Sequence, residues 1–183
     1  TCSARSLNPC SMPSNAWKKA MASATASEPT TFDTVRRNAC AATLTALTSP
    51  SYRATPGNAA VEDNQRFEFL GDAVFGMLAA EHVFTLYPGE DEGALTVRRS
   101  RIVSGKALAD LARGIGLGHY LRMRKQDEDK GGRDKERFLT EAMEALFGAV
   151  WRDGGLAAVQ TVFDRLVTAI PPEPLDPWSD NPK

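Results

Sequence analysis

The sequence is poor in cysteine and histidine. Its three cysteines, Cys2, Cys10 and Cys40, show no metal-ligand spacing, and its two histidines, His82 and His119, lie far apart. Such cysteines fit a reducing compartment better than a disulfide framework. We therefore expect no zinc or disulfide site and predict a structural role for both histidines.

The sequence also has no large excess of acidic or basic residues and no long hydrophobic run. Lysine and arginine total 22 and aspartate and glutamate 23, giving a pI near 6.1. Any nucleic-acid-binding surface must therefore be local. No uninterrupted apolar run approaches the ~18–20 residues of a membrane span, so we expect no membrane partner. A length of 183 residues suits one domain.

Composition predicts three parts. Residues 1–30 form a tail rich in Ser, Ala and Thr, residues 31–170 the folded domain, and residues 171–183 a Pro-rich tail. The first 27 residues contain no acid, which is typical of a mitochondrial transit segment and equally of a plain flexible tail. The predicted location is therefore mitochondrial or cytoplasmic. Because the chain does not begin with Met, we expect it to be processed or a fragment.

Helical periodicity dominates the folded part, which predicts an all-α fold. The predicted helices cover residues 32–48, 64–86, 91–103, 106–115, 136–151 and 156–170. A loop rich in Pro, Gly and Asn ends at about residue 63, and residues 122–137 are polar and loop-like. No strand of useful length with alternating polarity is present.

The second predicted helix carries two acids, Glu68 and Asp72, among apolar residues. Their spacing puts both on one face, about 6 Å apart along the axis. No Lys or Arg lies three or four residues from either acid, and the repulsion costs roughly 0.2–0.5 kcal/mol. The pair is therefore expected to bind a cation, and a metal ion is the simplest candidate. The alternative is a solvated acidic face.

The same helix has a core-facing side and an unusual glycine. We expect its inward residues to be Leu70, Val74, Met77 and Leu78. A glycine in mid-helix costs about 1 kcal/mol relative to alanine. Gly71 therefore predicts a close backbone approach by another element.

A second acidic pair, Glu141 and Glu144, lies three residues apart in the helix predicted at 136–151. Both acids again share one helical face. Arg137 precedes Glu141 by four residues, so an ordinary ion pair is an alternative role for that glutamate. Glu144 has no basic neighbour at helical spacing.

Four carboxylates on two facing helices suit phosphodiester hydrolysis. Two divalent ions roughly 3.5–4 Å apart can activate water and stabilise the leaving oxygen. Mg²⁺ prefers oxygen ligands, with Mn²⁺ as a substitute, and no His or Cys cluster competes for a softer metal. The candidate catalytic residues and metal ligands are therefore Glu68, Asp72, Glu141 and Glu144.

Two stretches resemble the ribonuclease III family. Residues 65–75 read QRFEFLGDAVF, against the family signature Glu-Arg-Leu-Glu-Phe-Leu-Gly-Asp-Ala/Ser-Val/Ile-Leu. Residues 139–149 resemble its Leu-Ala-Asp-x-x-Glu-Ala-Leu-Ile-Gly-Ala, and the likeness extends over about residues 44–163. The chain departs from the family at Ser49, Pro50, Gln65 and Glu141.

The resemblance implies an all-helical ribonuclease III domain with Mg²⁺-dependent endoribonuclease activity on double-stranded RNA. It also implies a homo- or heterodimer in which Phe69 packs into the partner, although a plain core Phe is the alternative. Seven basic residues could follow RNA phosphates, unless they form only a solvated face. These are Arg98, Arg99, Arg101, Arg122, Arg124, Lys125 and Arg133.

A non-catalytic role is the other interpretation. Ribonuclease III-like domains also serve as structural subunits that bind rRNA in the large subunit of the mitochondrial ribosome, or pair with an active subunit. Gln65 and Glu141 favour this role, whereas the retained Glu68, Asp72 and Glu144 favour the enzyme. Only a Pro-rich tail follows Ile170, where the family carries a double-stranded-RNA-binding module. We therefore expect another protein to present the RNA, or the chain to remain bound to it.

Overall fold

The structure, a computed structural model, describes residues 41–167, and nearly all of its ordered elements are helices. Within this range, β structure is limited to a single bridge between Thr48 and Arg122. The prediction of an all-α fold is confirmed. The three cysteines, the start of the helix predicted at 32–48 and both predicted tails lie outside the described residues. The domain boundaries at 31 and 170 stay a prediction.

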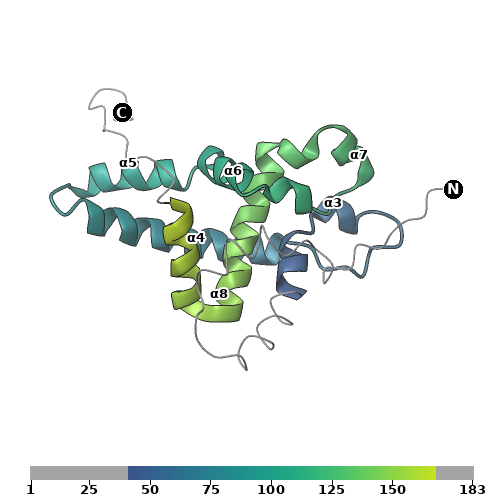
Figure 1. Cartoon of the computed structure of the whole chain (residues 1–183), viewed down its shortest axis with the longest axis horizontal. Helices are drawn as coiled ribbons and strands as arrows, with labels where there is room; N and C mark the ends of the chain where they lie inside the picture. The colour runs from purple at the N-terminus through teal and green to yellow at the C-terminus, as the bar shows by residue number, and fades with distance from the viewer. Residues whose placement is uncertain (1–40, 168–183) are drawn as a thin grey trace.

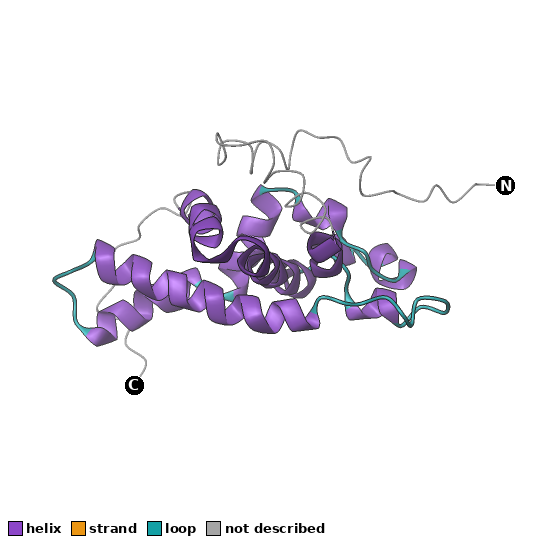
Figure 2. Cartoon of the chain, turned by 90° about the horizontal axis from the view of Figure 1, so that it is seen from below, coloured by secondary structure: helices purple, strands orange, loops and turns teal. Residues whose placement is uncertain are grey.

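The long helices begin and end close to their predicted limits. Residues 41–46 are helical, and the further elements are α3 (Pro50–Arg53), α4 (Gln65–Leu86), α5 (Glu92–Ile102), α6 (Gly105–Gly114), η2 (Leu117–Tyr120), α7 (Lys125–Asp129), η3 (Gly132–Asp134) and α8 (Glu136–Val167). Figure 1 shows α8 crossing α4 steeply, and Figure 2 shows α5 running back along α4. The short elements α3, α7, η2 and η3 were not predicted.

Side-chain caps explain where two of these helices begin. The Asp91 carboxylate accepts a hydrogen bond from the Ala94 N–H at 2.8 Å and starts α5, close to the start of the helix predicted at residues 91–103. The Ser104 hydroxyl accepts from the Ala107 N–H at 3.2 Å and starts α6. Both caps satisfy backbone donors that a helix leaves unpaired in its first turn.

Aromatic packing joins α4 to both halves of α8. The Phe75 ring lies 4.7 Å from that of Phe147 and 5.3 Å from that of Phe163, between ring centroids. All three side chains are fully buried. His82 packs edge-on against Phe163 at 5.7 Å, in keeping with its predicted structural role. Burial of this cluster fixes α4 against α8.

A bend at Gly155 makes this cluster possible. Helix α8 is continuous except at Gly155, whose φ of 65° and ψ of −162° are accessible almost only to glycine. This bend lies in the gap between the helices predicted at residues 136–151 and 156–170. The bend turns the last part of α8 back, so that Phe163 reaches α4.

One side of α4 stays uncovered. Val74 and Leu78 are buried as predicted and Leu70 is partly buried, but Met77 is 45% exposed, so its predicted core position is wrong. At 100° per residue, Met77 falls on the same side as Phe69, Ala73 and Phe84, all of them exposed. We call these four residues the α4 stripe.

Length and composition alone would also allow α4 to cross a membrane. An 18-residue window within this 22-residue helix has a mean hydropathy of 1.3. However, Asp72 and Glu81 interrupt its apolar residues, and α5 and α8 pack along it. Its role in this structure is that of the central helix of the bundle.

Candidate active site

A cleft of about 300 Å³ opens where α4 crosses α8. Gln65, Glu68, Phe69 and Asp72 line it from α4, and Glu144 lines it from α8. The structure thus brings together three of the four acids that the sequence singled out. Phe69 is also at this cleft, and its side chain is 82% exposed.

Two glycines let the helix backbones touch beside the cleft. A Cβ atom on Gly71 would lie 1.7 Å from the carbonyl oxygen of Glu144, and one on Gly148 would lie 2.3 Å from that of Phe67. No side chain fits in either gap, which confirms the close approach predicted at Gly71. Because Gly71 adjoins Asp72, this contact brings the acids of the two helices together.

The electrostatics of the cleft oppose ionisation of its acids. Burial, followed by the charges of Asp72, Glu68 and Glu141, raises the pKa of Glu144 to about 7. Burial and the charge of Glu141 also raise the pKa of Glu68. These two glutamates are costly to charge because they are desolvated and lie near other groups of the same sign. A bound cation would relieve both effects.

Glu141 is turned to a different neighbour. Its carboxylate accepts a hydrogen bond from the Arg137 Nε at 2.6 Å, and it does not line the cleft. The glutamate side chain is 15% exposed and the arginine side chain 79%. The alternative role foreseen for Glu141, an ion pair with Arg137, is therefore present. Its assignment as a metal ligand stays a prediction.

Comparison with known proteins identifies the family of this fold and cleft. A family model described as Ribonuclease-III-like matches residues 41–170. The chain belongs to the ribonuclease III-like family. It is 43% identical over 123 residues to Ribonuclease 3 of Syntrophotalea carbinolica, covering 67% of this chain and 53% of that protein. It is 46% identical over 114 residues to Ribonuclease 3 of Oleidesulfovibrio alaskensis, covering 62% and 49%.

Solved structures agree with this assignment. The nuclease domain of ribonuclease III from Campylobacter jejuni aligns with a TM-score of 0.68 and 26% identity, over 86% of this chain and 97% of that one. That domain is described as having a flexible region involved in dimer formation. The present chain spans about half the length of the curated relatives it matches. These relatives are bacterial and lend no support to the mitochondrial-ribosome alternative.

The donor atoms of this ribonuclease III-like cleft fit a hard divalent cation. They are carboxylate oxygens with an excess of negative charge, as Mg²⁺ prefers, and no soft ligand lies among the lining residues. Between residues 41 and 167, however, no three His, Cys, Asp or Glu side chains converge closely enough to hold a metal ion as they stand. The donor chemistry of the cleft therefore fits a hard cation, whereas the present geometry of its side chains does not form a ligand set.

Three of the arginines predicted to contact RNA are engaged within the fold. Arg98 pairs with Glu90 and lies 3.7 Å above the Tyr87 ring, which ties α5 to the end of α4. Arg122 lies 4.3 Å above the Tyr52 ring. Arg133 donates to the carbonyl oxygens of Gly118, His119 and Leu121. These contacts give each arginine a structural role.

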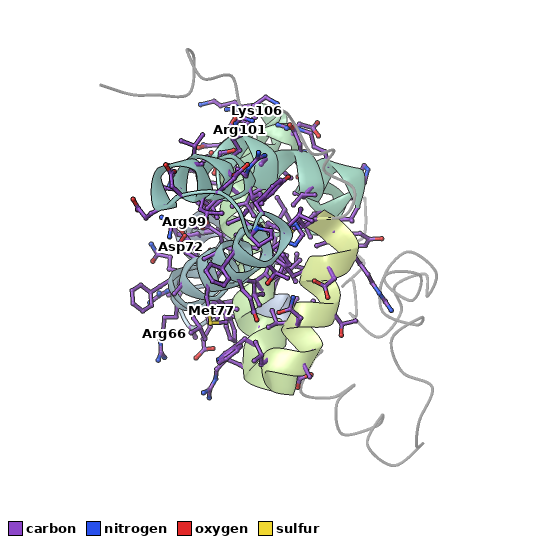
Figure 3. All side chains as sticks on the ribbon, turned by 90° about the vertical axis from the view of Figure 1, so that its left-hand side faces the viewer. Arg66, Asp72, Met77, Arg99, Arg101 and Lys106 are labelled. Carbon is purple, nitrogen blue, oxygen red and sulfur yellow. The ribbon has the colours of Figure 1, made fainter. Side chains whose placement is uncertain are left out.

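The other predicted RNA contacts are more accessible. Arg124 pairs with Asp127 and Lys125 with Asp129, both within the α7 region. Arg99 is exposed and Arg101 half-buried on α5. In the view of Figure 3, Arg99 projects near Asp72, whereas Arg101 projects beside Lys106 at the top. Among the basic residues predicted to contact RNA, Arg99 is therefore the exposed candidate on α5 for a ligand of the cleft.

Proposed function

We propose that this chain is an Mg²⁺-dependent endoribonuclease that hydrolyses phosphodiester bonds in double-stranded RNA. The observation that carries the proposal is the meeting of Glu68 and Asp72 with Glu144 in one cleft. Membership of the ribonuclease III-like family supports the same reaction class. The bacterial relatives also favour the cytoplasmic alternative for its location.

Within this proposal, Glu68, Asp72, Glu141 and Glu144 hold the divalent ions. When bound, the ions supply activation of water and stabilisation of the leaving oxygen. The chain itself contributes the charge and the positions of the ligands. Burial and the charges of neighbouring acids raise the pKa of Glu144, which supports the proposal because a bound cation would favour the charged carboxylate. The backbone contact between Gly71 and Glu144 fixes the position of the acids on α4 relative to Glu144 on α8.

We further propose that two copies pair through the α4 stripe. Phe69 is 82% exposed and Phe84 71%, so neither is a core residue of the single chain. The alternative that Phe69 is a plain core residue is therefore wrong. Exposed aromatic side chains on one helical face are typical of a protein interface. Pairing would place two clefts on one assembly, each serving one strand of an RNA duplex.

The direct test is incubation of the full chain with long duplex RNA and Mg²⁺, beside a Glu144→Gln variant. We expect the wild-type chain to give short products with staggered 3′ ends. The variant should give none, because it lacks one of the proposed ligands. Chelation of the metal should also stop cleavage, and Mn²⁺ should restore it. Intact RNA with the wild-type chain and Mg²⁺ would contradict the proposal and favour a non-catalytic RNA-binding role.

A further inference from the structure

Arg137 and Glu141 form an ion pair at the margin of the cleft. Arg137 is the second residue of α8, and Glu141 follows one turn later. The hydrogen bond from the Arg137 Nε holds the Glu141 carboxylate, while Glu144, a further turn along, faces the cleft. Glu141 is thus paired with Arg137 and does not line the cleft that Glu68, Asp72 and Glu144 share.

The charge of Arg137 also reaches the cleft. Burial and Glu141 raise the pKa of Glu68, and Arg137 opposes them. By contrast, only burial and other acids act on Glu144. The positive charge of Arg137 therefore partly offsets the negative charge around Glu68 and Glu141.

We propose that Arg137 is a positioning residue that holds Glu141 out of the cleft until a divalent ion enters and replaces the guanidinium as its counter-charge. This inference rests on the proposed function, because the ion is the one proposed there. It accounts for the position of Glu141, the one proposed ligand that does not line the cleft. It also predicts that divalent ions bind against competition from the arginine.

The pair is weak enough to be displaced. The Arg137 side chain is 79% exposed, so water screens its attraction to Glu141. An exposed pair of this kind shifts an equilibrium by roughly 1.5- to 5-fold. Its loss should therefore tighten ion binding by a similar factor. High exposure also means that replacing Arg137 leaves the hydrophobic core intact.

The test is a Mn²⁺ titration of the full chain without RNA, followed by electron paramagnetic resonance. We expect Arg137→Gln to bind Mn²⁺ roughly 1.5- to 5-fold more tightly than the wild type. Arg137→Lys, which keeps the charge, should stay close to the wild type. Lys135→Gln is the matched control, because it removes one positive charge from an exposed residue of the same segment. It should leave the affinity unchanged.

A double-mutant cycle separates positioning from a general effect of charge. With Glu141→Gln as the background, Arg137→Gln should give no further gain, since its target carboxylate is gone. An equal gain in that background, an equal gain from Lys135→Gln, or no gain at all would each overturn the inference. Failure of the wild type to bind Mn²⁺ is a different result. It would refute the metal site of the proposed function and this inference with it.

Discussion

At the scale of single residues, Glu144 links the cleft to measurable stability. Its pKa is raised to about 7 by burial and by the charges of Asp72, Glu68 and Glu141. The folded chain therefore binds this proton more tightly than the unfolded chain, where the pKa is near 4.5. Below pH 4.5 both states are protonated and Glu144 has no cost. As the pH rises from 4.5 through 7, it increasingly destabilises the folded chain.

We therefore expect Glu144→Gln to be more stable than the wild type at pH 8, by on the order of 2 kcal/mol in the absence of metal ions. At pH 4.5 the two proteins should differ much less, because both side chains are then uncharged in the folded state. Thermal unfolding at the two pH values measures the difference. A stability gain that is the same at both pH values would mean that charge in the cleft is not its cause.

The residues of the site were predictable to different degrees. Glu68, Asp72 and Glu144 could be predicted because helical spacing and the absence of basic neighbours both indicate an acidic face. Glu141 could not be placed, because Arg137 four residues earlier allows either an ion pair or a cleft ligand. Only the three-dimensional arrangement shows that the ion pair forms.

At the scale of helices, the Gly71–Gly148 contact sets the distance between α4 and α8. We expect Gly71→Ala to lower the free energy of unfolding by roughly 3 kcal/mol or more, since its Cβ would lie 1.7 Å from a backbone oxygen that cannot move alone. Gly76→Ala is the matched control on the same helix, because nothing lies within 4 Å of its Cβ. It should stabilise α4 by up to about 1 kcal/mol. Urea unfolding compares the two, and similar effects would contradict the role of the contact.

We expect Arg133 to stabilise the fold and Arg99 to contact RNA. Arg133 bonds three backbone carbonyl groups near η2, so Arg133→Met should cost roughly 2–3 kcal/mol of stability. Arg99 is exposed, so Arg99→Gln should leave stability unchanged and reduce the slope of log affinity against log salt by about 1. Binding titrations at several salt concentrations, beside thermal unfolding, test both. An unchanged slope for Arg99→Gln would remove it from the RNA surface.

Helix lengths were predictable, whereas the short elements and one helical face were not. The elements α3, α7, η2 and η3 span three to five residues, too few to show periodicity. Met77 was wrongly predicted as a core residue because apolar residues lie on two sides of α4. Periodicity alone cannot distinguish a buried apolar side from an exposed one. Exposure in the folded chain makes that distinction.

At the scale of the whole molecule, the cleft and the α4 stripe meet at Phe69, which belongs to both. The acids of the cleft come from α4 and α8 of the same chain, whereas the proposed pairing would bury the stripe against a second molecule. Ion binding and dimer formation should therefore be separable. Under the proposed function, activity on duplex RNA should depend on both, because each strand would be cut in its own cleft.

Phe69→Ala separates the two properties without adding charge to the cleft. We expect it to shift the dimer–monomer equilibrium toward monomer, as sedimentation velocity would show, because a large apolar contact is lost. Mn²⁺ affinity should remain near that of the wild type, while cleavage of duplex RNA should fall at protein concentrations where the variant is monomeric. Leu156→Ala is the control, since Leu156 is 50% exposed but lies on α8 outside the stripe. If Phe69→Ala stayed as dimeric as Leu156→Ala, the pairing surface would have to lie elsewhere, and the exposure of Phe69 would serve the cleft alone.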